Sequence, residues 1–325
     1  MNRRYVIYGA GAVGGVIGGG LALGGLDVSL VARGDHPAAL QDRGLDFRHH
    51  GGTDVLALPA VEDPAELKLT AGDVVILAMK TQHTEAALDV LAAGSPPGIA
   101  VVCAQNGVEN ERLALRRFAN VYGLCVLLPG SHLEPGVVVG SGQPMFGVLD
   151  VGRYPTGSDD LAEEIAAALT AGNFRSEASD AVMRHKYAKL RVNTGNALDA
   201  ACGPGSRSSD LTARAAAEAL AVFEAAGIDV ATKAEVDDRR EGFSMAEVAG
   251  QGRSGSSSWQ SLARGSGSIE ADFLNGEIVL LGRLHGVPTP VNEALRRLAN
   301  RMAAAGEEPG SLTLAEVEAL VAEGG

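Results

Sequence analysis

The first half of the chain alternates short apolar runs with segments of helical periodicity. The four apolar runs of strand length at its start cover residues 5–8, 28–31, 74–79 and 99–103. Further strands are expected at residues 121–128, 137–139, 146–151 and 174–176, with a helix at 161–169. Continuous apolar strands separated by helices are typical of a parallel sheet covered on both faces. This pattern predicts an α/β fold that begins with a Rossmann-type, doubly wound parallel sheet.

The second half of the chain has helical periodicity almost throughout. Its predicted helices cover residues 180–201, 210–226, 269–285 and 291–305. We therefore expect a Rossmann domain over residues 1–178 and a mainly α-helical domain over residues 179–325. A stretch rich in Gly and Ser, residues 249–258, is interpreted as a loop, and the sequence leaves open whether it closes as a lid.

A glycine-rich turn directly follows the first predicted strand. It reads Gly9-Ala10-Gly11-Ala12-Val13-Gly14, a G-x-G-x-x-G motif with a helical pattern after it. In such a motif the first glycine permits the tight turn, the second lets the backbone approach a pyrophosphate, and the third allows close packing. The N–H groups that open the following helix, those of Ala12, Val13 and Gly14, would then face the phosphates. The motif predicts dinucleotide binding.

The end of the second predicted strand indicates which dinucleotide binds. No Asp or Glu that could hold a ribose 2′-hydroxyl stands there, and Arg33 occupies the position. A guanidinium group suits a 2′-phosphate, so the sequence favours NADP(H) over NAD(H). The alternative is an exposed arginine without a ligand.

Polar residues follow two further strands of the same predicted sheet. Lys80 comes directly after the run 74–79, and Asn106 comes shortly after the run 99–103. Ligands of open parallel sheets lie outside the carboxyl ends of the strands. Lys80 is therefore a candidate for binding a carboxylate or phosphate, and Asn106 for binding the nicotinamide or a substrate carbonyl.

The second half carries candidates for acid chemistry and substrate binding. Lys189, Asn193 and Asn196 are spaced i, i+4 and i+7, which would place them on one face of the predicted helix 180–201. The alternative is a solvated polar stripe or a helix cap. Ser258 and Glu270 form a second cluster, with Glu270 in the first turn of the predicted helix 269–285. A glutamate there is also explained by the helix dipole alone.

Composition narrows the classes of partner. The net charge of −13 argues against nucleic acid, which needs clustered Lys and Arg. The three cysteines lack a C-x-x-C pairing, and no run reaches the roughly 20 apolar residues of a membrane helix, so we expect a cytoplasmic protein. The histidines show no metal-ligand spacing, and no metal site is assigned. The sequence leaves both a homodimer and a monomer open.

An ordered set of motifs along nearly the whole chain resembles the ketopantoate reductases (2-dehydropantoate 2-reductases). The set consists of the glycine-rich turn, Val31-Ala32-Arg33-Gly34, Lys80, Gln105-Asn106-Gly107, Tyr187-Ala188-Lys189-Leu190 with Asn193, Ser257-Ser258, and the segments 270–276 and 285–292. The resemblance implies an oxidoreductase of pantothenate biosynthesis that acts on a CH–OH group.

The same resemblance implies roles for the candidate residues. Lys189 would be the general acid that protonates the 2-keto oxygen while NADPH delivers hydride to the adjoining carbon. Asn193 and Glu270 would position Lys189 and the substrate hydroxyl, with Asn196 as a further substrate ligand. Ser258 would bind the substrate carboxylate.

Three departures from the family pattern cluster in the substrate half. The second asparagine, Asn196, comes one residue early, Trp259 and Leu262 replace an expected Met and Asp, and the Gly/Ser-rich approach to Ser256 is longer. Reduction of ketopantoate by NADPH is the leading hypothesis. The alternatives are a related reductase of another 2-keto acid and a non-catalytic NADP-binding sensor.

Overall fold

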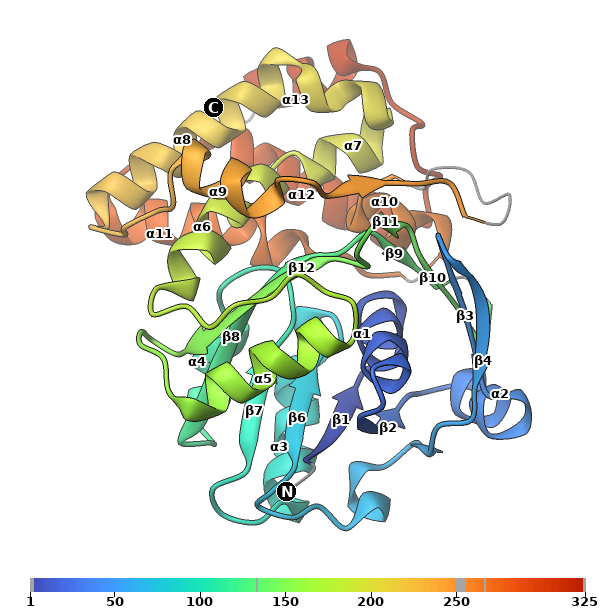
Figure 1. Ribbon diagram of the computed structural model, residues 1–325. Helices are drawn as coiled ribbons and strands as arrows, with labels where there is room; N and C mark the ends of the chain where they lie inside the picture. Colours follow the sequence, from blue (N-terminus) through green and yellow to red (C-terminus); the bar gives the residue numbers. More distant parts are fainter. Residues whose placement is uncertain (1–2, 133, 249–254, 266, 324–325) are drawn as a thin grey trace. The chain divides into compact units, whose positions relative to one another are not determined.

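The computed structural model describes residues 3–132, 134–248, 255–265 and 267–323, and the chain divides into two compact units (Figure 1). Unit 1 comprises Met1–Lys186 and Lys233–Gly252, and unit 2 comprises Tyr187–Thr232 and Arg253–Gly325. The predicted division at residues 178/179 differs from this in two ways: unit 1 extends to Lys186, and a later segment returns to it. Hydrophobic periodicity identifies a helix but not the unit against which it packs.

Unit 1 is built on a seven-stranded sheet, which confirms the predicted fold class. Only β12 (Val148–Arg153) runs antiparallel to its neighbour among the paired strands of this sheet. The central strands β6 and β7 are buried at every residue, which explains why their sequences are continuously apolar. Across the sheet the order is β12 (Val148–Arg153), β8 (Asn120–Leu127), β7 (Ala100–Cys103), β6 (Val74–Leu77), β1 (Arg4–Tyr8), β2 (Asp27–Val31) and β5 (Ala60–Val61).

Helices cover both faces of this sheet. One face packs against α1 (Ala12–Leu23) and α5 (Asp160–Ala171), and the other against α3 (Thr84–Gly94) and α4 (Asn110–Leu115) (Figure 1). The two faces bury separate aliphatic clusters. The short helices α2 (Asp35–Arg43), η1 (Pro64–Leu67) and η2 (Thr81–His83) complete the connections.

A second sheet in unit 1 was mostly missed by the sequence analysis. It contains, in order, β4 (Gly52–Leu56), β3 (Leu45–His49), β10 (Val137–Gly140) and β9 (Gly130–Ser131). Only β10 was predicted, because β3 and β4 mix polar with apolar residues and β9 has only two residues. The strand predicted at residues 174–176 is reduced to an isolated parallel bridge, in which Arg175 pairs with Val148 of β12.

The segment that returns to unit 1 is fixed there by paired charges and a short ribbon. Its helix α9 (Lys233–Arg240) carries Arg239, whose Nε donates to Asp150 Oδ2 at 2.9 Å. Asp150 lies on β12 and is 4% exposed. Next along the chain, β13 (Ser244–Met245) pairs with β11 (Gly142–Gln143). A buried carboxylate of the sheet thus finds its partner some ninety positions further along the chain.

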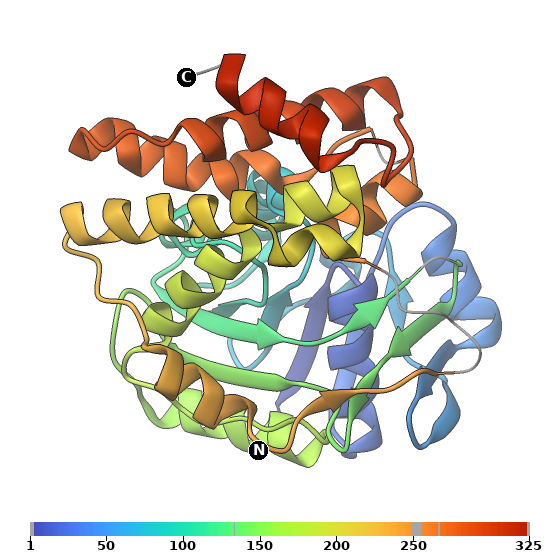
Figure 2. The ribbon, with the colours of Figure 1, turned by 90° about the horizontal axis from the view of Figure 1, so that it is seen from above.

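Unit 2 is helical, with α8 (Asp210–Ala225), α11 (Asn275–His285) and α12 (Pro290–Ala305) packed side by side (Figure 2). Its aliphatic core joins α8 and α12 to α7 (Asn196–Cys202) and α13 (Leu314–Glu323). The predicted helices 210–226 and 291–305 are confirmed as α8 and α12, with small shifts in their ends. The helices are α6 (Val182–Asn193), which begins in unit 1, α7 (Asn196–Cys202), η3 (Pro204–Ser208), α8 (Asp210–Ala225), α10 (Ser257–Ala263), η4 (Glu270–Phe273), α11 (Asn275–His285), α12 (Pro290–Ala305) and α13 (Leu314–Glu323).

Two predicted helices are interrupted in the structure. The helix expected at 180–201 breaks between α6 and α7, and the one expected at 269–285 is a 3₁₀ turn followed by α11. In the first case Gly195 stands at the break. Glycine weakens a helix interior, so the chain can leave the helical conformation there. Over the described part of the chain, no helix is long and apolar enough to span a bilayer.

Candidate functional site

Packing alone requires two of the three motif glycines. Gly9 has a φ of +101°, and a Cβ added there would lie 2.6 Å from the backbone nitrogen of Met79. A Cβ on Gly14 would overlap the carbonyl oxygen of Gly9. These contacts bring the β1–α1 turn against the end of β6.

The second glycine of the motif is different. A Cβ added to Gly11 would come within 4 Å of no atom in the described part of the chain. Gly11 is also the N-cap of α1, and no described side chain caps that helix. The start of α1 therefore offers its first N–H groups and the positive end of its dipole to an anion.

A buried histidine that the sequence analysis did not select fastens this turn. His36 is 5% exposed, its Nε2 lies 2.9 Å from the carbonyl oxygen of Ala10, and its Nδ1 accepts the backbone N–H of Gly136 at 2.8 Å. Burial, and then the neighbouring His132, lower the pKa of His36 to about 4. A neutral ring that donates from Nε2 and accepts at Nδ1 satisfies both bonds. No local pattern in the sequence marks His36.

The cations predicted at the strand ends lie close to one histidine. Burial is the first cause that lowers the pKa of His83, and the charges of Arg33 and Lys80 lower it further. Arg33 is exposed after β2, and Lys80 is half-buried after β6. The carboxyl edge of the sheet thus carries positive charge beside the glycine-rich turn, as an anionic cofactor requires.

The turn that carries Asn106 is held by a network of side chains. Gln105 Nε2 donates to Thr84 Oγ1 at 2.7 Å, and Thr84 Oγ1 donates to Asn110 Oδ1 at 2.7 Å. Asn110 Nδ2 in turn donates to Thr81 Oγ1 at 3.1 Å and to the backbone carbonyl of Asn106 at 3.1 Å. These bonds join the segment after β6 to the segment after β7. The side chain of Asn106 is only partly exposed.

A buried ion pair supports the same turn from the other side. Lys186 and Glu111 are 3% and 0% exposed, and Lys186 Nζ lies 2.5 Å from Glu111 Oε1. Lys186 Nζ also donates to the carbonyl oxygens of Gln105 at 3.0 Å and Cys103 at 3.4 Å. Burial raises the pKa of the Glu111 carboxyl, and the charge of Lys186 lowers it in part. No local pattern in the sequence marks either residue.

In unit 2, the predicted polar stripe is divided between two helices. Lys189 and Asn193 lie on α6, which ends at Asn193, and Asn196 begins α7. The prediction of one regular helical face is therefore wrong for Asn196. Asn193 is 7% exposed, and its Nδ2 atom has no hydrogen-bond partner among the described residues.

A buried polar network fixes the break between α6 and α7. Asn275 Nδ2 donates to the carbonyl oxygen of Thr194 at 2.9 Å and to Asn292 Oδ1 at 3.0 Å. Asn292 Nδ2 donates to Glu218 Oε2 at 2.7 Å and to the carbonyl oxygen of Ala215 at 3.0 Å. Asn275 on α11 thus gives the Thr194 carbonyl the hydrogen bond that an unbroken helix would have provided, and residues of α12 and α8 hold Asn275 in place. This network leaves no local pattern in the sequence, because its members are far apart along the chain.

The start of α10 is fixed to α7. The backbone N–H of Ser256 donates to Asp199 Oδ2 at 2.7 Å, and Ser256 Oγ donates to the carbonyl oxygen of Asn196 at 3.3 Å. Ser258 follows inside α10 and is 4% exposed. The predicted loop 249–258 thus ends in a helix, while residues 249–254 lie outside the described part of the chain. Trp259 packs on the core of unit 2.

Glu270 is buried, with 6% exposure, and begins the 3₁₀ helix η4 rather than an α-helix. η4 leads directly into Asn275, which holds the break at Thr194. Contacts through Ser256 and Asn275 therefore gather the ends of α6 and η4 and the starts of α7 and α10 within unit 2. The segments that carry all five candidates of this unit meet there.

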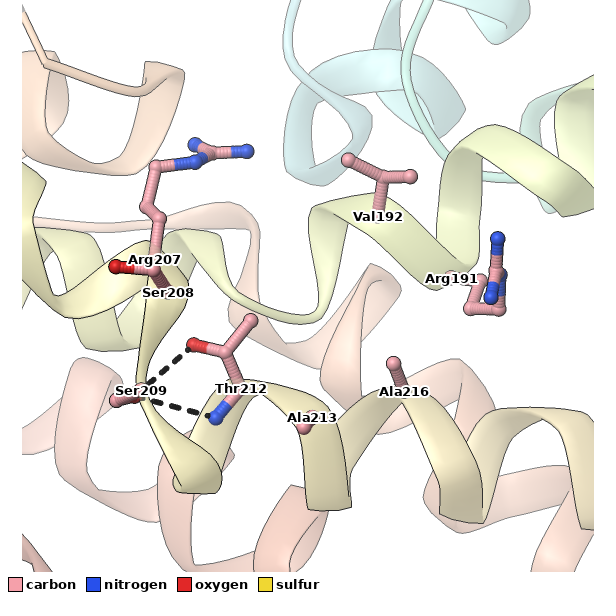
Figure 3. Close-up of a pocket in the computed structure, with 8 residues that line it drawn as sticks. All are labelled: Arg191, Val192, Arg207, Ser208, Ser209, Thr212, Ala213 and Ala216. Atoms are coloured by element: carbon pink, nitrogen blue, oxygen red, sulfur yellow. Dashed lines mark hydrogen bonds between the residues drawn. The ribbon is translucent and has the colours of Figure 1, made fainter. Parts of the chain in front are cut away.

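The pocket of unit 2 shown in Figure 3 does not contain these candidates. It has a volume of about 390 Å³ and lies between α6, which contributes Arg191 and Val192, and the start of α8. Arg207 also lines it and donates to Asn196 Oδ1 at 3.1 Å. In the portion of the chain that the structure describes, no three His, Cys, Asp or Glu residues group as metal ligands.

Comparison with known proteins decides the family. Residues 5–154 match the family described as ketopantoate reductase PanE/ApbA, and residues 181–303 match the C-terminal domain of the same family. The chain belongs to the ketopantoate reductase family. The resemblance inferred from the motifs is thereby confirmed, as is the prediction of an oxidoreductase.

Individual members of the ketopantoate reductase family align with nearly the whole chain. The 2-dehydropantoate 2-reductase of Halobacterium salinarum is 29% identical over 92% of this chain and 99% of its own length. The enzyme of the same name from Archaeoglobus fulgidus is 30% identical over 91% and 96%. A crystal structure of a PanE/ApbA family ketopantoate reductase from Ralstonia eutropha superposes with a TM-score of 0.78 at 28% identity, covering 93% and 99% of the two chains.

One more distant structure shares the fold. D-mandelate dehydrogenase in a ternary complex with NADH and anilino(oxo)acetate superposes with a TM-score of 0.77 over 93% of this chain and 99% of its own. At 22% identity this likeness concerns the fold alone.

Proposed function

We propose that this protein reduces a 2-keto acid to a 2-hydroxy acid with NADPH, and that its substrate is 2-dehydropantoate (ketopantoate). The observation that carries the proposal is the buried amide nitrogen of Asn193, which lies one helical turn after Lys189 and has no partner among the described residues. A buried donor left unsatisfied costs about 1–3 kcal/mol. An oxygen of a bound substrate would remove that cost.

Unit 1 supplies the groups that suit the cofactor. The open approach at Gly11 and the uncapped start of α1 fit a pyrophosphate. Arg33 would bind the 2′-phosphate, and Lys80 and Asn106 would bind polar groups nearer the nicotinamide. NADPH, when bound, supplies the hydride.

Unit 2 supplies the groups that would handle the proton and the substrate. The Lys189 ammonium donates a proton to the 2-keto oxygen as negative charge develops on it. Asn193 donates its free amide hydrogen to a substrate oxygen, and Ser258 Oγ donates to the substrate carboxylate. The Glu270 carboxylate accepts from the substrate hydroxyl and balances the charge of Lys189. Asn196, held by Arg207, would support the same substrate from α7.

The choice of substrate rests on the relatives. The two archaeal relatives reported above are named 2-dehydropantoate 2-reductases, and each aligns over nearly its whole length. The interrupted helix at Asn196 and the tryptophan at position 259 favour another 2-keto acid as the second candidate, because both change the shape of the substrate half.

The test is oxidation of NADPH by the purified protein with ketopantoate, followed by absorbance. NADH replaces NADPH in a parallel series, and a branched and an aromatic 2-keto acid replace ketopantoate. Turnover with NADPH and ketopantoate supports the proposal. Turnover with another 2-keto acid but not with ketopantoate would identify that acid as the substrate instead. Tight NADPH binding without turnover on any of the acids would favour a sensor.

A further inference from the structure

The buried pair Lys186–Glu111 needs an explanation beyond stability. Both side chains are almost wholly removed from water, which is costly for two charges. Apolar residues of similar volume often stabilise a fold as well or better in such a place. The pair must therefore supply something that an apolar contact cannot.

The additional contacts of Lys186 show what that is. Its ammonium group donates to the carbonyl oxygens of Cys103, the last residue of β7, and Gln105. Asn106 is the next residue. An apolar side chain at position 186 would leave both carbonyls without this donor, and Glu111 lies against the ammonium as its counter-ion.

The turn is thus held at two points. Lys186 holds it just before Asn106, and Asn110 Nδ2 holds the carbonyl of Asn106 itself. With the backbone fixed on both sides, the Asn106 side chain leaves the turn in one direction. Binding groups need such support, because a misplacement of about 1 Å can cost about a hundredfold in rate.

We propose that Lys186 is a positioning residue for Asn106, with Glu111 as its counter-ion, an inference that rests on the proposed binding role of Asn106. The helix that carries the proposed acid Lys189 then also orders, three residues earlier, the amide that binds cofactor or substrate. Neither Lys186 nor Glu111 touches a ligand in this proposal.

A double-mutant cycle tests the inference in the full-length protein. The variant Lys186→Met/Glu111→Leu removes both charges together, so no lone charge is left buried to unfold the protein. The dissociation constant for NADPH and the KM for ketopantoate are measured for this variant, for Asn106→Ala, and for the combination. We expect each change to weaken the same ligand about tenfold or more, and the combination to be no worse than Asn106→Ala alone. Additive effects, or a pair variant that binds and turns over normally, would overturn the inference.

A matched control lies on the same helix. Arg184 Nη1 pairs with Glu235 Oε1 at 2.6 Å, and both side chains are partly exposed. Arg184→Met/Glu235→Leu should change the same constants less than about twofold.

Hydrogen exchange separates the inference from the proposed function. The backbone amides of residues 104–110 should exchange faster in the Lys186→Met/Glu111→Leu variant than in the native protein. Their exchange rates should be unchanged in the Arg184→Met/Glu235→Leu control. Unchanged exchange in the pair variant would refute positioning whatever Asn106 does. Faster exchange together with normal binding and turnover in Asn106→Ala would instead refute the binding role of Asn106, and with it the purpose assigned to the pair.

Discussion

Helix α1 in unit 1 and the interrupted helix α6–α7 in unit 2 present their proposed ligand groups in opposite ways. At α1 the groups are backbone N–H, and the turn that presents them lacks side chains at Gly9 and Gly11. At α6–α7 the groups are side chains. Their positions depend on Asn275 and on the network behind it.

This contrast separates two kinds of dependence on sequence. The α1 site depends on a few adjacent residues and on one distant support, His36, which fastens the turn at Ala10. The α6–α7 site depends on contacts from α8, α11 and α12, so it is sensitive to changes far along the chain. Catalytic groups of the second kind are oriented by neighbours that never meet the substrate.

The largest expected effect is at Lys189. Lys189→Ala should lower kcat by about 10²–10⁴, because a general acid contributes that much, and leave the dissociation constant of NADPH nearly unchanged. Steady-state kinetics and a fluorescence titration measure the two quantities. Arg191→Ala on the same helix is the control and should retain activity. Loss of NADPH binding in Lys189→Ala would mean that this lysine is not the acid of unit 2.

The next largest effect separates two glycines of one turn. Gly9→Ala should lower the free energy of unfolding by about 3 kcal/mol or more, because φ is positive and the new Cβ would press on Met79. Gly11→Ala should cost less than about 1 kcal/mol, since its Cβ meets no described atom, yet weaken NADPH about tenfold. Urea unfolding and cofactor titration compare the two. Equal losses of stability would contradict the distinction.

Acid should weaken the turn through His36. The pKa of His36 is lowered to about 4 from 6.5, so the folded state holds this proton less readily than the unfolded state. The stabilisation is complete above pH 6.5 and is lost as the pH falls from 6.5 towards 4. It amounts to at most about 3 kcal/mol.

Urea unfolding at several pH values across this window measures the effect. His36→Gln should flatten the pH dependence, whereas His285→Gln, which changes an exposed histidine, should leave it intact. A slope that survives His36→Gln would assign the acid sensitivity to other groups.

The smallest expected effect concerns the choice of cofactor. Arg33→Ser should weaken NADPH about tenfold and leave NADH almost unchanged, because only NADPH carries the 2′-phosphate. The preference of the native protein should also shrink at high salt, since Arg33 is exposed. Arg43→Ser, at the end of α2, is the control. An equal loss of affinity for NADPH and NADH would mean that Arg33 does not bind the 2′-phosphate.

The sequence was sufficient where the structure is repetitive or local. The buried strands β6 and β7 are continuously apolar and can be recognised for that reason, and the glycine-rich turn is contiguous. The sequence was insufficient to predict the second sheet, where β4 is mostly exposed and lacks an apolar run. The helix break at Gly195 was also missed, because one glycine is compatible with an unbroken helix when its surroundings are unknown.

The candidate site divides along the same line. Gly11 and Lys189 stand in motifs that a reader of the sequence can find. His36, Lys186 and Asn275 act through carbonyl groups that are distant in sequence, at Ala10, Gln105 and Thr194. A single sequence contains no sign of such pairings, because any polar residue that is spaced suitably looks the same before the chain is folded.

The return of Lys233–Gly252 to unit 1 has a consequence for biosynthesis. A ribosome releases β12 long before it releases Arg239, the partner of the buried Asp150. The nascent chain must therefore hold a sheet in which this carboxylate has the backbone N–H of Glu177 but no cationic partner until most of the polypeptide has been made. For the same reason, a fragment cut at residue 178 or 186 would lack α9 and β13. A stable, excised cofactor domain would have to be made by joining the two segments rather than by truncation.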